Sequence, residues 1–375
     1  MKSKSETKPR ELRTGFIGTG FIAEVHARVL ARIAGARLTG VFDTDATRGS
    51  SFAHRHGAQY VCNSIEELSE LVDVVHILAP PPFHAKHATQ CLERGLDVLI
   101  EKPVATSTAE CRQIAAAALA SSSHVGVNHN ATCFPAFRSA VEQIRRGRFG
   151  ELQHVTVVVN VGLRQLSKGE HRHWMFRKPE NLLLEQAPHP LSQILFLLGK
   201  VKSASALPAG EVVLNTGVRL YDTWQISLVC ERGTAQCFIS LGREYGDVWL
   251  QLIGQDATAF VDFRRNTFRI SEKSRFMEPL DFFLDSFRNA GRTASQARRN
   301  LTDYVLGFVG LRPPGDPFFE SMRASIGGFY DSLRANQHVP AGLEEGTAVI
   351  EAYEQIVASA ESILNQDKTA RTIYA

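Results

Sequence analysis

The sequence predicts an α/β protein in two parts: a parallel sheet wound with helices, followed by a domain with a large, mostly antiparallel open sheet. Short apolar strands alternate with helical segments over about the first 130 residues, which is the order typical of a parallel sheet. Between residues 153 and 263, apolar residues recur with period two, as in antiparallel strands. The length of 375 residues also favours two domains over one.

Composition and charge place the chain among globular proteins and exclude several classes of partner. Apolar residues make up 44% of the sequence and charged residues 22%, and the formal net charge is +3. Because this charge is small and spread along the chain, we expect no nucleic acid and no membrane as partners. The six cysteines form no CxxC pair, and residues 1–13 lack the apolar core of a signal peptide, so we expect reduced thiols in a cytoplasmic protein.

A glycine turn separates the first predicted strand from the first predicted helix. Residues 14–17 are apolar, Gly18-Thr19-Gly20 follows, and apolar residues then recur at helical spacing. A second strand over 37–42 ends at Asp43, which stands 23 positions after Gly20. Such glycines let the backbone approach a pyrophosphate, and an acid at this distance accepts hydrogen bonds from a ribose. The pattern favours a dinucleotide-binding Rossmann domain over a purely structural turn.

Later strands bring further residues to the same edge of the predicted sheet. Helices over 47–56, 65–71 and 84–94 alternate with strands over 72–78 and 97–100. The last of these strands leads directly into Glu101-Lys102-Pro103. Because ligands bind at the carboxyl ends of parallel strands, Lys102 is predicted to face the ligand, although surface lysines before prolines are common.

These motifs resemble those of a known family. The segments GFIGTGFIAEVHARVL, VFDTDATR, ILAPPPFHAKHA, LDVLIEKPVATS, VGVNHN and LLLEQAPHPLSQILFLLG are similar in order and spacing to the Gfo/Idh/MocA family of nicotinamide-dependent sugar and cyclitol oxidoreductases. The resemblance covers roughly residues 13–270 and a C-terminal pair of helices. It implies an NAD-binding Rossmann domain followed by an α+β substrate domain.

The resemblance also implies which residues contact the cofactor. They are Gly18, Gly20, Phe21, Ile22, Asp43, Arg48, Ala79, Pro80, Pro81, His84, Glu101, Lys102 and Asn128. Asp43 favours NAD over NADP because its carboxylate would repel the additional phosphate, while Arg48 leaves some use of NADP open. No metal site is expected, since no third ligand is spaced with His171 and His173.

Three residues match the catalytic positions of the family: Lys102, Glu185 and His189. The ammonium of Lys102 is expected to stabilise the reacting oxygen, and His189 to act as general base because imidazole titrates near neutral pH. Glu185 lies four residues before His189, so one helix would carry both on one face, with Glu185 bound to a substrate hydroxyl or tuning Lys102. Pro188 and Pro190 indicate instead that the helix proper starts near Pro190, with His189 at or just before its first turn. Substrate contacts are expected from Lys102, His129, Arg172, His173, Trp174, Glu185 and His189.

The sequence differs from the family pattern around His189. Glu185 stands where relatives often have Asp, Ser192 where many have a second Asp, and Glu180-Asn181 where a glycine pair is usual. These differences affect the expected substrate contacts and, to a lesser degree, the redox activity, while the fold prediction stands. The loop over 164–177 is expected near the substrate, with a solvated surface loop as the alternative.

The second half predicts the open sheet and an additional helical segment. Strands are expected over 153–161, 211–220, 224–231, 234–241, 248–253 and 257–263. One face should cover the helices that carry Glu185 and His189, and the other should pair subunits, as relatives do, in a homodimer or homotetramer. Between 272 and 315, apolar residues at helical spacing predict two amphipathic helices joined by RTASQARRN. They would form an extra core layer or dimer contact, or else a lid or dock for a bulky or anionic substrate.

The predicted domain boundaries follow from these elements. A flexible arm is expected over 1–13, the Rossmann domain over 14–130, the substrate and oligomerisation domain over 131–363, and a tail over 364–375. Helices near 317–335 and 344–363 complete the chain, and the second is expected to pack back on the Rossmann domain.

The resulting functional hypothesis is an NAD-dependent oxidoreductase acting on a secondary hydroxyl or ketone of a sugar, cyclitol or sugar derivative. Arginines in the 164–177 loop and the 272–315 insertion favour an anionic or glycosylated substrate. Two alternatives stay open. One is a redox-neutral enzyme in which tightly held NAD transiently oxidises a sugar before elimination, and the other is a non-catalytic nicotinamide-binding sensor.

Overall fold

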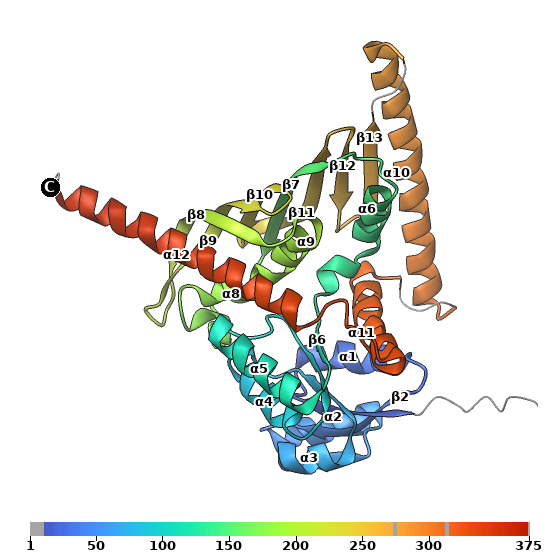
Figure 1. Ribbon diagram of the computed structural model, residues 1–375, viewed down its shortest axis with the longest axis vertical. Helices are drawn as coiled ribbons and strands as arrows, with labels where there is room; N and C mark the ends of the chain where they lie inside the picture. The colour runs from blue at the N-terminus through green and yellow to red at the C-terminus, as the bar shows by residue number, and fades with distance from the viewer. Residues whose placement is uncertain (1–10, 273–275, 312–314, 374–375) are drawn as a thin grey trace, which may run out of the picture. The chain divides into compact units, whose positions relative to one another are not determined.

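The computed structural model describes residues 11–272, 276–311 and 315–373 and contains two compact units (Figure 1). Unit 1 comprises residues 1–128 and 322–346, and unit 2 comprises residues 129–321 and 347–375. Most of the expected arm, residues 1–10, lies outside the described residues, and Arg13 already belongs to the first strand. Within the described ranges, the structure offers no helix with the length and hydropathy that a membrane span requires.

Unit 1 is built on a six-stranded parallel sheet with the strand order β3-β2-β1-β4-β5-β6. Its strands are β1 (Leu12–Ile17), β2 (Ala36–Phe42), β3 (Tyr60–Cys62), β4 (Val74–Ile77), β5 (Asp97–Ile100) and β6 (Val125–Val127). The alternating helices are α1 (Phe21–Leu30), α2 (Ala46–His56), α3 (Ile65–Leu71), α4 (His84–Leu92) and α5 (Thr108–Ser121), with the short η1 (Pro81–Phe83) before α4. This strand order is that of a doubly wound Rossmann domain, so the predicted fold of the first part is confirmed.

A late helix completes the core of unit 1. Helix α11 (Pro317–Ala335) contributes Phe329 and Tyr330, both buried. Gly126 in β6 makes room for it, because a Cβ at that position would lie 2.5 Å from Cδ2 of Phe329. The last helix, α12 (Leu343–Ile373), belongs to unit 2 from Thr347 on, and its packing on the Rossmann domain stays a prediction.

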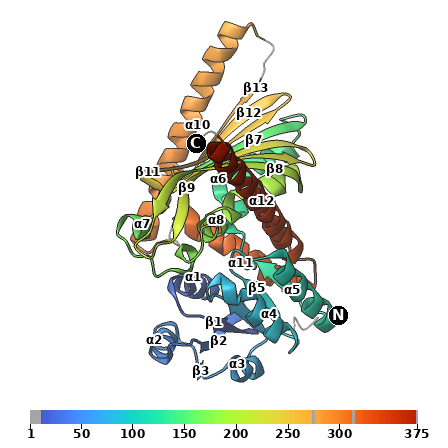
Figure 2. The ribbon, with the colours of Figure 1, turned by 90° about the vertical axis from the view of Figure 1, so that its left-hand side faces the viewer.

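Unit 2 is built on a seven-stranded sheet with the order β13-β12-β11-β7-β10-β9-β8 (Figure 2). Its strands are β7 (Leu152–Gly162), β8 (Val201–Val213), β9 (Arg219–Cys230), β10 (Gly233–Ser240), β11 (Gly242–Gly254), β12 (Ala257–Asp262) and β13 (Thr267–Glu272). Neighbouring strands are antiparallel except β10 and β7, which are parallel. The mostly antiparallel sheet predicted for the second part is confirmed.

Helices cover one face of this sheet. Those in contact with its strands include α6 (Pro135–Arg145), α8 (Asn181–Gln186) and α9 (Pro188–Leu198). The short elements α7 (Arg164–Ser167), η2 (Asn130–Cys133) and η3 (Trp174–Phe176) lie in the connections. Residues such as Val157 and Leu250 are buried, whereas alternate positions such as Val229 remain exposed. Pairing of subunits through the second face stays a prediction.

Two strand predictions for unit 2 need correction. The strand expected over 211–220 is wrong, because β8 ends at Val213 and β9 starts at Arg219, with a turn closed by the Leu214 N–H and the Val218 carbonyl at 2.9 Å. Gly217 supplies the positive φ, +82°, that this turn requires. Most of β8 was not predicted, because Pro208 is a turn signal in sequence. As the last strand of the sheet, β8 tolerates a proline.

The prediction for residues 272–315 is also wrong in form. The structure has one continuous helix, α10 (Glu278–Phe308), where two joined helices were expected. The joining segment RTASQARRN contains alanine, glutamine and arginine, which are strong helix formers, and no proline. No residue of α10 is buried, so the interpretation of its apolar stripe as a core layer is wrong as well.

Candidate active site

The turn between β1 and α1 places backbone amides at the carboxyl edge of the parallel sheet. Gly18 has a φ of +92°, and an added Cβ would lie 2.8 Å from the Leu78 backbone, so glycine is required by the fold itself. Apart from its two neighbours in the chain, no described residue has a heavy atom within 4 Å of a Cβ added at Gly20. The second glycine therefore leaves open space at the N-terminus of α1, where helix amides lack partners within the helix.

Asp43 joins this turn to α2. Its Oδ2 accepts hydrogen bonds from the Thr19 N–H at 2.8 Å and the Thr19 hydroxyl at 2.5 Å. Arg48 donates to both carboxylate oxygens, at 3.0 and 2.7 Å, and the Asp45 N–H donates at 2.9 Å. These five donors use the lone pairs of the carboxylate. A ribose hydroxyl that binds Asp43 must therefore displace Arg48, whose side chain is 51% exposed.

The same donors determine the charge of Asp43. Burial alone would raise its pKa, but the hydrogen bonds from Arg48, Thr19 and the Asp45 backbone outweigh burial and lower the pKa to about 2. Asp43 is thus an anion throughout the neutral range. A second anion brought next to it would be repelled unless Arg48 moved to meet that anion.

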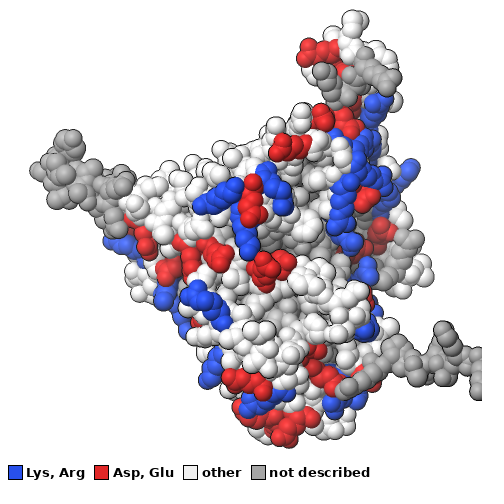
Figure 3. Space-filling view, viewed as in Figure 1, with Lys and Arg blue, Asp and Glu red and all other residues white. Residues whose placement is uncertain are grey.

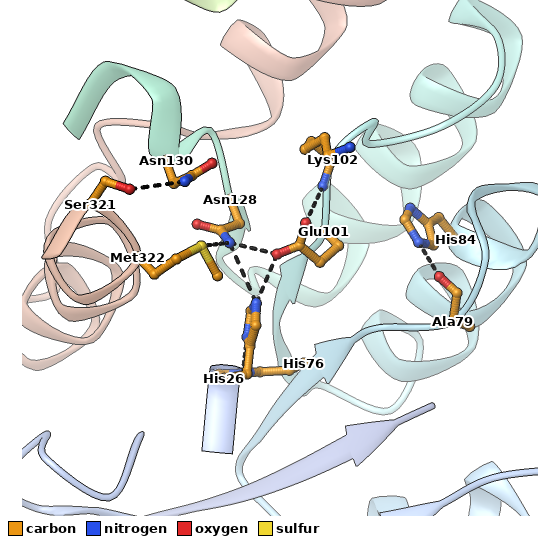
Figure 4. Close-up of polar contacts among 10 residues, drawn as sticks. All are labelled: His26, His76, Ala79, His84, Glu101, Lys102, Asn128, Asn130, Ser321 and Met322. Carbon is orange, nitrogen blue, oxygen red and sulfur yellow. Dashed lines mark hydrogen bonds and ion pairs between the residues drawn. The ribbon is translucent and has the colours of Figure 1, made fainter. Parts of the chain in front are cut away.

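Glu101 holds the backbone at Lys102 (Figure 4). Strand β5 ends at Ile100, and the Lys102–Pro103 peptide bond that follows is cis. Glu101 is 7% exposed, and its Oε2 accepts the Lys102 N–H at 3.1 Å. The other oxygen, Oε1, lies 2.8 Å from Nε2 of His26 and accepts from Nδ2 of Asn128 at 2.5 Å. Figure 4 shows the Lys102 side chain extending in a different direction, so the carboxylate fixes the backbone and leaves the ammonium to other partners.

A chain of hydrogen bonds continues from Glu101 through the core of unit 1. Nδ1 of His26 lies 3.0 Å from Nδ1 of His76, and Nε2 of His76 lies 2.9 Å from the Tyr330 hydroxyl. The Tyr330 hydroxyl lies 2.7 Å from the Thr14 hydroxyl. Each of these four residues is fully buried. The chain therefore connects α1, β4, α11 and β1 to the turn that carries Lys102.

The chemistry of the groups restricts where the protons lie. The Glu101 carboxylate only accepts, so Nε2 of His26 carries a proton. When His26 is neutral, its Nδ1 accepts from His76, and the Tyr330 hydroxyl donates to Nε2 of His76. When His26 carries a second proton, every bond from His26 to Thr14 reverses and all remain satisfied. The chain of hydrogen bonds can therefore take up one additional proton at His26, and every hydrogen bond in it is kept.

Burial sets the other charges in this chain. It lowers the pKa of His76 well below the ordinary value and raises the pKa of the Tyr330 hydroxyl, so both are neutral at pH 7. Burial would also raise the pKa of Glu101, but hydrogen bonds and charges from His26, Asn128 and Lys102 outweigh it and lower the pKa to about 2. Glu101 is the fixed anion of the chain.

His84 and Asn128, both expected to contact the cofactor, are buried. The ring nitrogens of His84 lie 2.7 Å from the Ala79 carbonyl and 2.8 Å from the Pro103 carbonyl, so the ring connects the segments after β4 and β5. Asn128 also points its Nδ2 at the Met322 sulfur, at 3.3 Å. Its Oδ1 is buried and has no hydrogen-bond donor among the described residues. That oxygen is able to accept an N–H from a ligand.

The remaining expected cofactor contacts lie at the ends of β1 and β4. Phe21 is exposed, Ile22 and Ala79 are half-buried, Pro80 is exposed and Pro81 is buried. Because these residues follow parallel strands, they share the sheet edge with the glycine turn and Lys102.

Unit 2 carries Glu185 and His189 on two successive helices, so the expectation of one helix is wrong. Glu185 lies in α8, and α9 begins at Pro188, which places His189 in its first turn. Pro188 and Pro190 lack the N–H groups that would continue the hydrogen bonds of α8. Ala187 keeps helical angles, φ −66° and ψ −26°, so the chain continues to turn, and both side chains are half-buried.

Ser192 and the loop over 164–177 have local partners in unit 2. The Ser192 hydroxyl donates to the His189 carbonyl at 2.8 Å. Arg172 and His173 are exposed, but Trp174 is only 5% exposed and packs in the core, as does His129 at 3%. A substrate contact from Trp174 or His129 stays a prediction, whereas their burial gives both a packing role.

Sequence reasoning missed the residues behind Glu101. His26 and His76 stand in apolar segments where an alternating or helical pattern predicts only buried apolar side chains. Two histidines in buried positions are themselves a signal, because buried polar groups need partners. Nothing in the sequence shows that the partners are each other and Tyr330, which is 254 residues from His76.

The fold and this edge of the sheet define a dinucleotide-binding protein of the Rossmann class. Residues 12–129 match the model of an oxidoreductase family with an NAD-binding Rossmann fold, and residues 137–260 match the Gfo/Idh/MocA C-terminal domain. The chain belongs to the Gfo/Idh/MocA oxidoreductase family. The predicted resemblance and the NAD-binding character of the first domain are confirmed.

Individual relatives are similar over parts of the chain. Inositol 2-dehydrogenase 1 of Saccharopolyspora erythraea is 37% identical over 109 residues, which cover 28% of this chain and 32% of that protein. This chain thus matches about a third of the length of the first curated relatives.

Solved structures are similar over nearly the whole chain. UDP-N-acetylglucosamine 3-dehydrogenase from Acidithiobacillus ferrooxidans has a TM-score of 0.71 at 20% identity, covering 94% of this chain and 99% of that one. Levoglucosan dehydrogenase in complex with NADH and levoglucosan has a TM-score of 0.77 at 17% identity, covering 94% and 97%. At these identities the similarity establishes the fold.

Proposed function

We propose that the protein is an NAD-dependent oxidoreductase that converts a secondary hydroxyl or ketone of a sugar, cyclitol or sugar derivative. The observation that carries the proposal is Lys102, which follows β5 at the same sheet edge as the glycine turn, with its backbone N–H bound to buried Glu101. An ammonium held at this edge is suited to stabilise a reacting oxygen. The inositol and levoglucosan dehydrogenases among the similar proteins support the substrate class.

Two features of unit 1 fit a nicotinamide dinucleotide. The open space at Gly20 allows a pyrophosphate to approach the first amides of α1. The buried Oδ1 of Asn128 has no donor among the described residues and could accept a carboxamide N–H. Asp43 would bind the ribose once Arg48 is displaced. Bound NAD supplies the acceptor for a hydride.

The remaining chemistry is assigned to three side chains. In the oxidative direction the carbinol carbon loses a hydride and its hydroxyl loses a proton. We assign the proton to the imidazole of His189 and the developing negative charge on oxygen to the ammonium of Lys102. Glu185 would accept a hydrogen bond from a neighbouring substrate hydroxyl. The half-buried positions of Glu185 and His189 at the junction of α8 and α9 support these assignments.

The direct test follows NADH absorbance while inositols, sugars, sugar phosphates and glycosides are offered one at a time with NAD. We expect one NADH per product molecule for at least one of these compounds. Product that forms without NADH accumulation would replace the proposal with redox-neutral chemistry. Binding of NADH with no turnover of any compound would favour the sensor.

The two glycines of the turn are expected to respond differently to alanine. Gly18→Ala should lower the free energy of unfolding of unit 1 by about 2 kcal/mol or more, because of its positive φ and the contact with the Leu78 backbone. Gly20→Ala should leave stability within about 0.5 kcal/mol of wild type but weaken NADH binding about tenfold by filling the open space. Hydrogen exchange of β1 and titration with NADH measure the two effects. Equal stability of both variants would contradict this division of roles.

Asp43 and Arg48 are expected to set the choice of cofactor in opposite directions. Asp43→Ala should weaken NAD binding about tenfold and strengthen NADP binding, because the repelling carboxylate is lost and Arg48 becomes available for a phosphate. Arg48→Ala should strengthen NAD binding, because the ribose no longer has to displace Arg48, and weaken NADP binding further, so it is the matched control. Calorimetric titration with both cofactors measures the four affinities. A preference of the intact protein for NADP would contradict the assignment of Asp43.

A further inference from the structure

Helix α10 has no buried residue over its length of 31 residues. At 1.5 Å per residue it is about 45 Å long. Figures 1 and 2 show it beside β13, the edge strand of the sheet in unit 2, and extending beyond that strand. Because helices in proteins are stabilised mainly by packing an apolar face, a helix of this kind needs a partner that the described part of the chain does not supply.

The polar face of α10 is the one that packs on the sheet. The side chain of Gln296 accepts from the Phe268 N–H at 2.6 Å and donates to the Phe268 carbonyl at 2.9 Å. Asn300 donates to the Arg265 carbonyl at 2.8 Å, and Asp285 accepts from the Ser271 hydroxyl at 2.7 Å. These bonds satisfy backbone groups at the sheet edge and fix the rotation of the helix about its axis.

The opposite face carries a coiled-coil pattern. Apolar residues recur at alternating spacings of three and four over four heptads, which is the pattern of a and d positions. These nine residues, here called the α10 seam, are Leu280, Phe283, Phe287, Ala290, Ala294, Ala297, Leu301, Tyr304 and Phe308. All nine are exposed, including Phe287 at 72% and Phe308 at 84%. Helix α10 therefore presents its polar face to its own sheet and leaves the coiled-coil seam uncovered.

We propose that two copies of this chain pair through the α10 seam as an antiparallel coiled coil with its two-fold axis between Ala294 and Ala297. The seam has large side chains at both ends and three alanines in the middle. With the axis there, Phe283 of one copy meets Phe308 of the other and Phe287 meets Tyr304, so each layer joins an a position to a d position, as an antiparallel coiled coil requires. Ala294 meets Ala297 in the middle and Ala290 lies against Leu301. The large rings pack together, and the seam is complementary to itself.

Charge supports self-pairing in this direction. The positions that flank the seam contain a single charged residue, Arg298, so the pair brings no like charges together at its edges. In α10, three acidic and two basic side chains precede Ala294, and two basic and one acidic follow it. In an antiparallel pair, the more acidic half before Ala294 in one copy lies beside the more basic half after Ala294 in the other. The two helix dipoles then point in opposite directions, which is favourable. Figure 3 shows basic side chains gathered over α10, and apart from Arg298 these arginines lie away from the seam and its flanks.

The exposed area is sufficient for a stable pair. Aromatic side chains bury about 150–250 Å² each, and four of them in the seam are 63–84% exposed. In two copies these rings alone would bury on the order of 1,000 Å², near the lower end of what specific interfaces bury. An apolar patch of this size is rare on a monomeric protein surface.

Light scattering during gel filtration tests the pairing on the full chain. Phe283→Glu combined with Phe287→Glu should halve the mass of the wild-type assembly. Phe282→Glu is the matched control, because Phe282 is as exposed as Phe283, 64%, but lies off the seam, and it should leave the mass unchanged. Circular dichroism should show that every variant stays folded, and any loss of helix content in the double variant should not exceed the share of α10, which has then lost its partner. A monomeric wild type, an unchanged mass of the double variant, or an equal effect of Phe282→Glu would overturn the proposal.

Cysteine crosslinking tests the direction of the pair. A mixture of Phe287→Cys and Tyr304→Cys proteins should form a crosslinked heterodimer on mild oxidation, and neither variant should crosslink efficiently with itself. The wild type is the control for its own six cysteines. Efficient self-crosslinking of both variants would mean a parallel pair and would overturn the antiparallel arrangement.

Discussion

Replacing Lys102 with methionine is expected to lower kcat for hydride transfer about a thousandfold, while NADH still binds within a few-fold of its wild-type affinity. Removal of one group that stabilises charge in a transition state typically costs a factor of about 10²–10³. Glu101 holds the backbone N–H of Lys102, which the substitution leaves in place, so the turn after β5 should keep its geometry. The loss should therefore fall on the chemical step and spare cofactor binding.

Stopped-flow measurement of the first turnover and titration with NADH separate these two effects. Lys86→Met is the matched control, because Lys86 is an exposed lysine of α4, and it should retain wild-type kcat. If Lys102→Met kept more than a tenth of kcat, Lys102 would have no part in the chemistry. If the variant lost NADH binding instead, Lys102 would be a cofactor-binding residue.

The parts of the fold that the sequence predicts are those encoded by neighbours in the chain. The alternation of strands and helices up to β5, the turn at Gly18 and Gly20, and the acid at Asp43 each rest on a spacing of a few residues. Lys102 directly follows a buried strand, and the family resemblance implied its role. Each of these signals is local, and each places a residue at the carboxyl edge of the parallel sheet.

The features that escaped prediction depend on distant residues or on competing local signals. The partners of Asp43 and Glu101 come from other elements, and Thr14 and Tyr330 are 316 residues apart. Helix α10 was divided in two because its arginine-rich middle suggested a loop, although helix propensity favours a continuous helix there. Its apolar stripe predicted contact with other side chains, but the sequence cannot show that the polar face packs on the sheet and the apolar one is left exposed.

Replacing Glu101 with alanine is expected to lower the free energy of unfolding of unit 1 by about 3 kcal/mol at pH 7. The side chains of His26 and Asn128 and the N–H of Lys102 would lose their common acceptor inside the protein. Glu101→Gln should lose less, about 1 kcal/mol, because an amide can bond all three groups if the Asn128 amide reverses and His26 takes the tautomer in which Nε2 accepts. Glu93→Gln, on the exposed surface, should match wild type.

Hydrogen exchange of β5 is the suitable measurement, because all three tryptophans lie in unit 2 and their fluorescence reports that unit.

The pKa of Glu101 is about 2 in the folded protein, below its ordinary value, so its stabilising effect is complete above about pH 4.5 and is lost as the pH falls toward 2. Neutral His76 acts in a different pH region, because its lowered pKa costs stability as the pH falls below about 6.5. The difference between wild type and Glu101→Ala should shrink as the pH falls from 4.5 toward 2, and Glu101→Gln should show the same trend. A difference that stays the same or grows in that window would mean that Glu101 is already protonated in the folded protein, and the buried chain would then lack the anion that holds Lys102 in place.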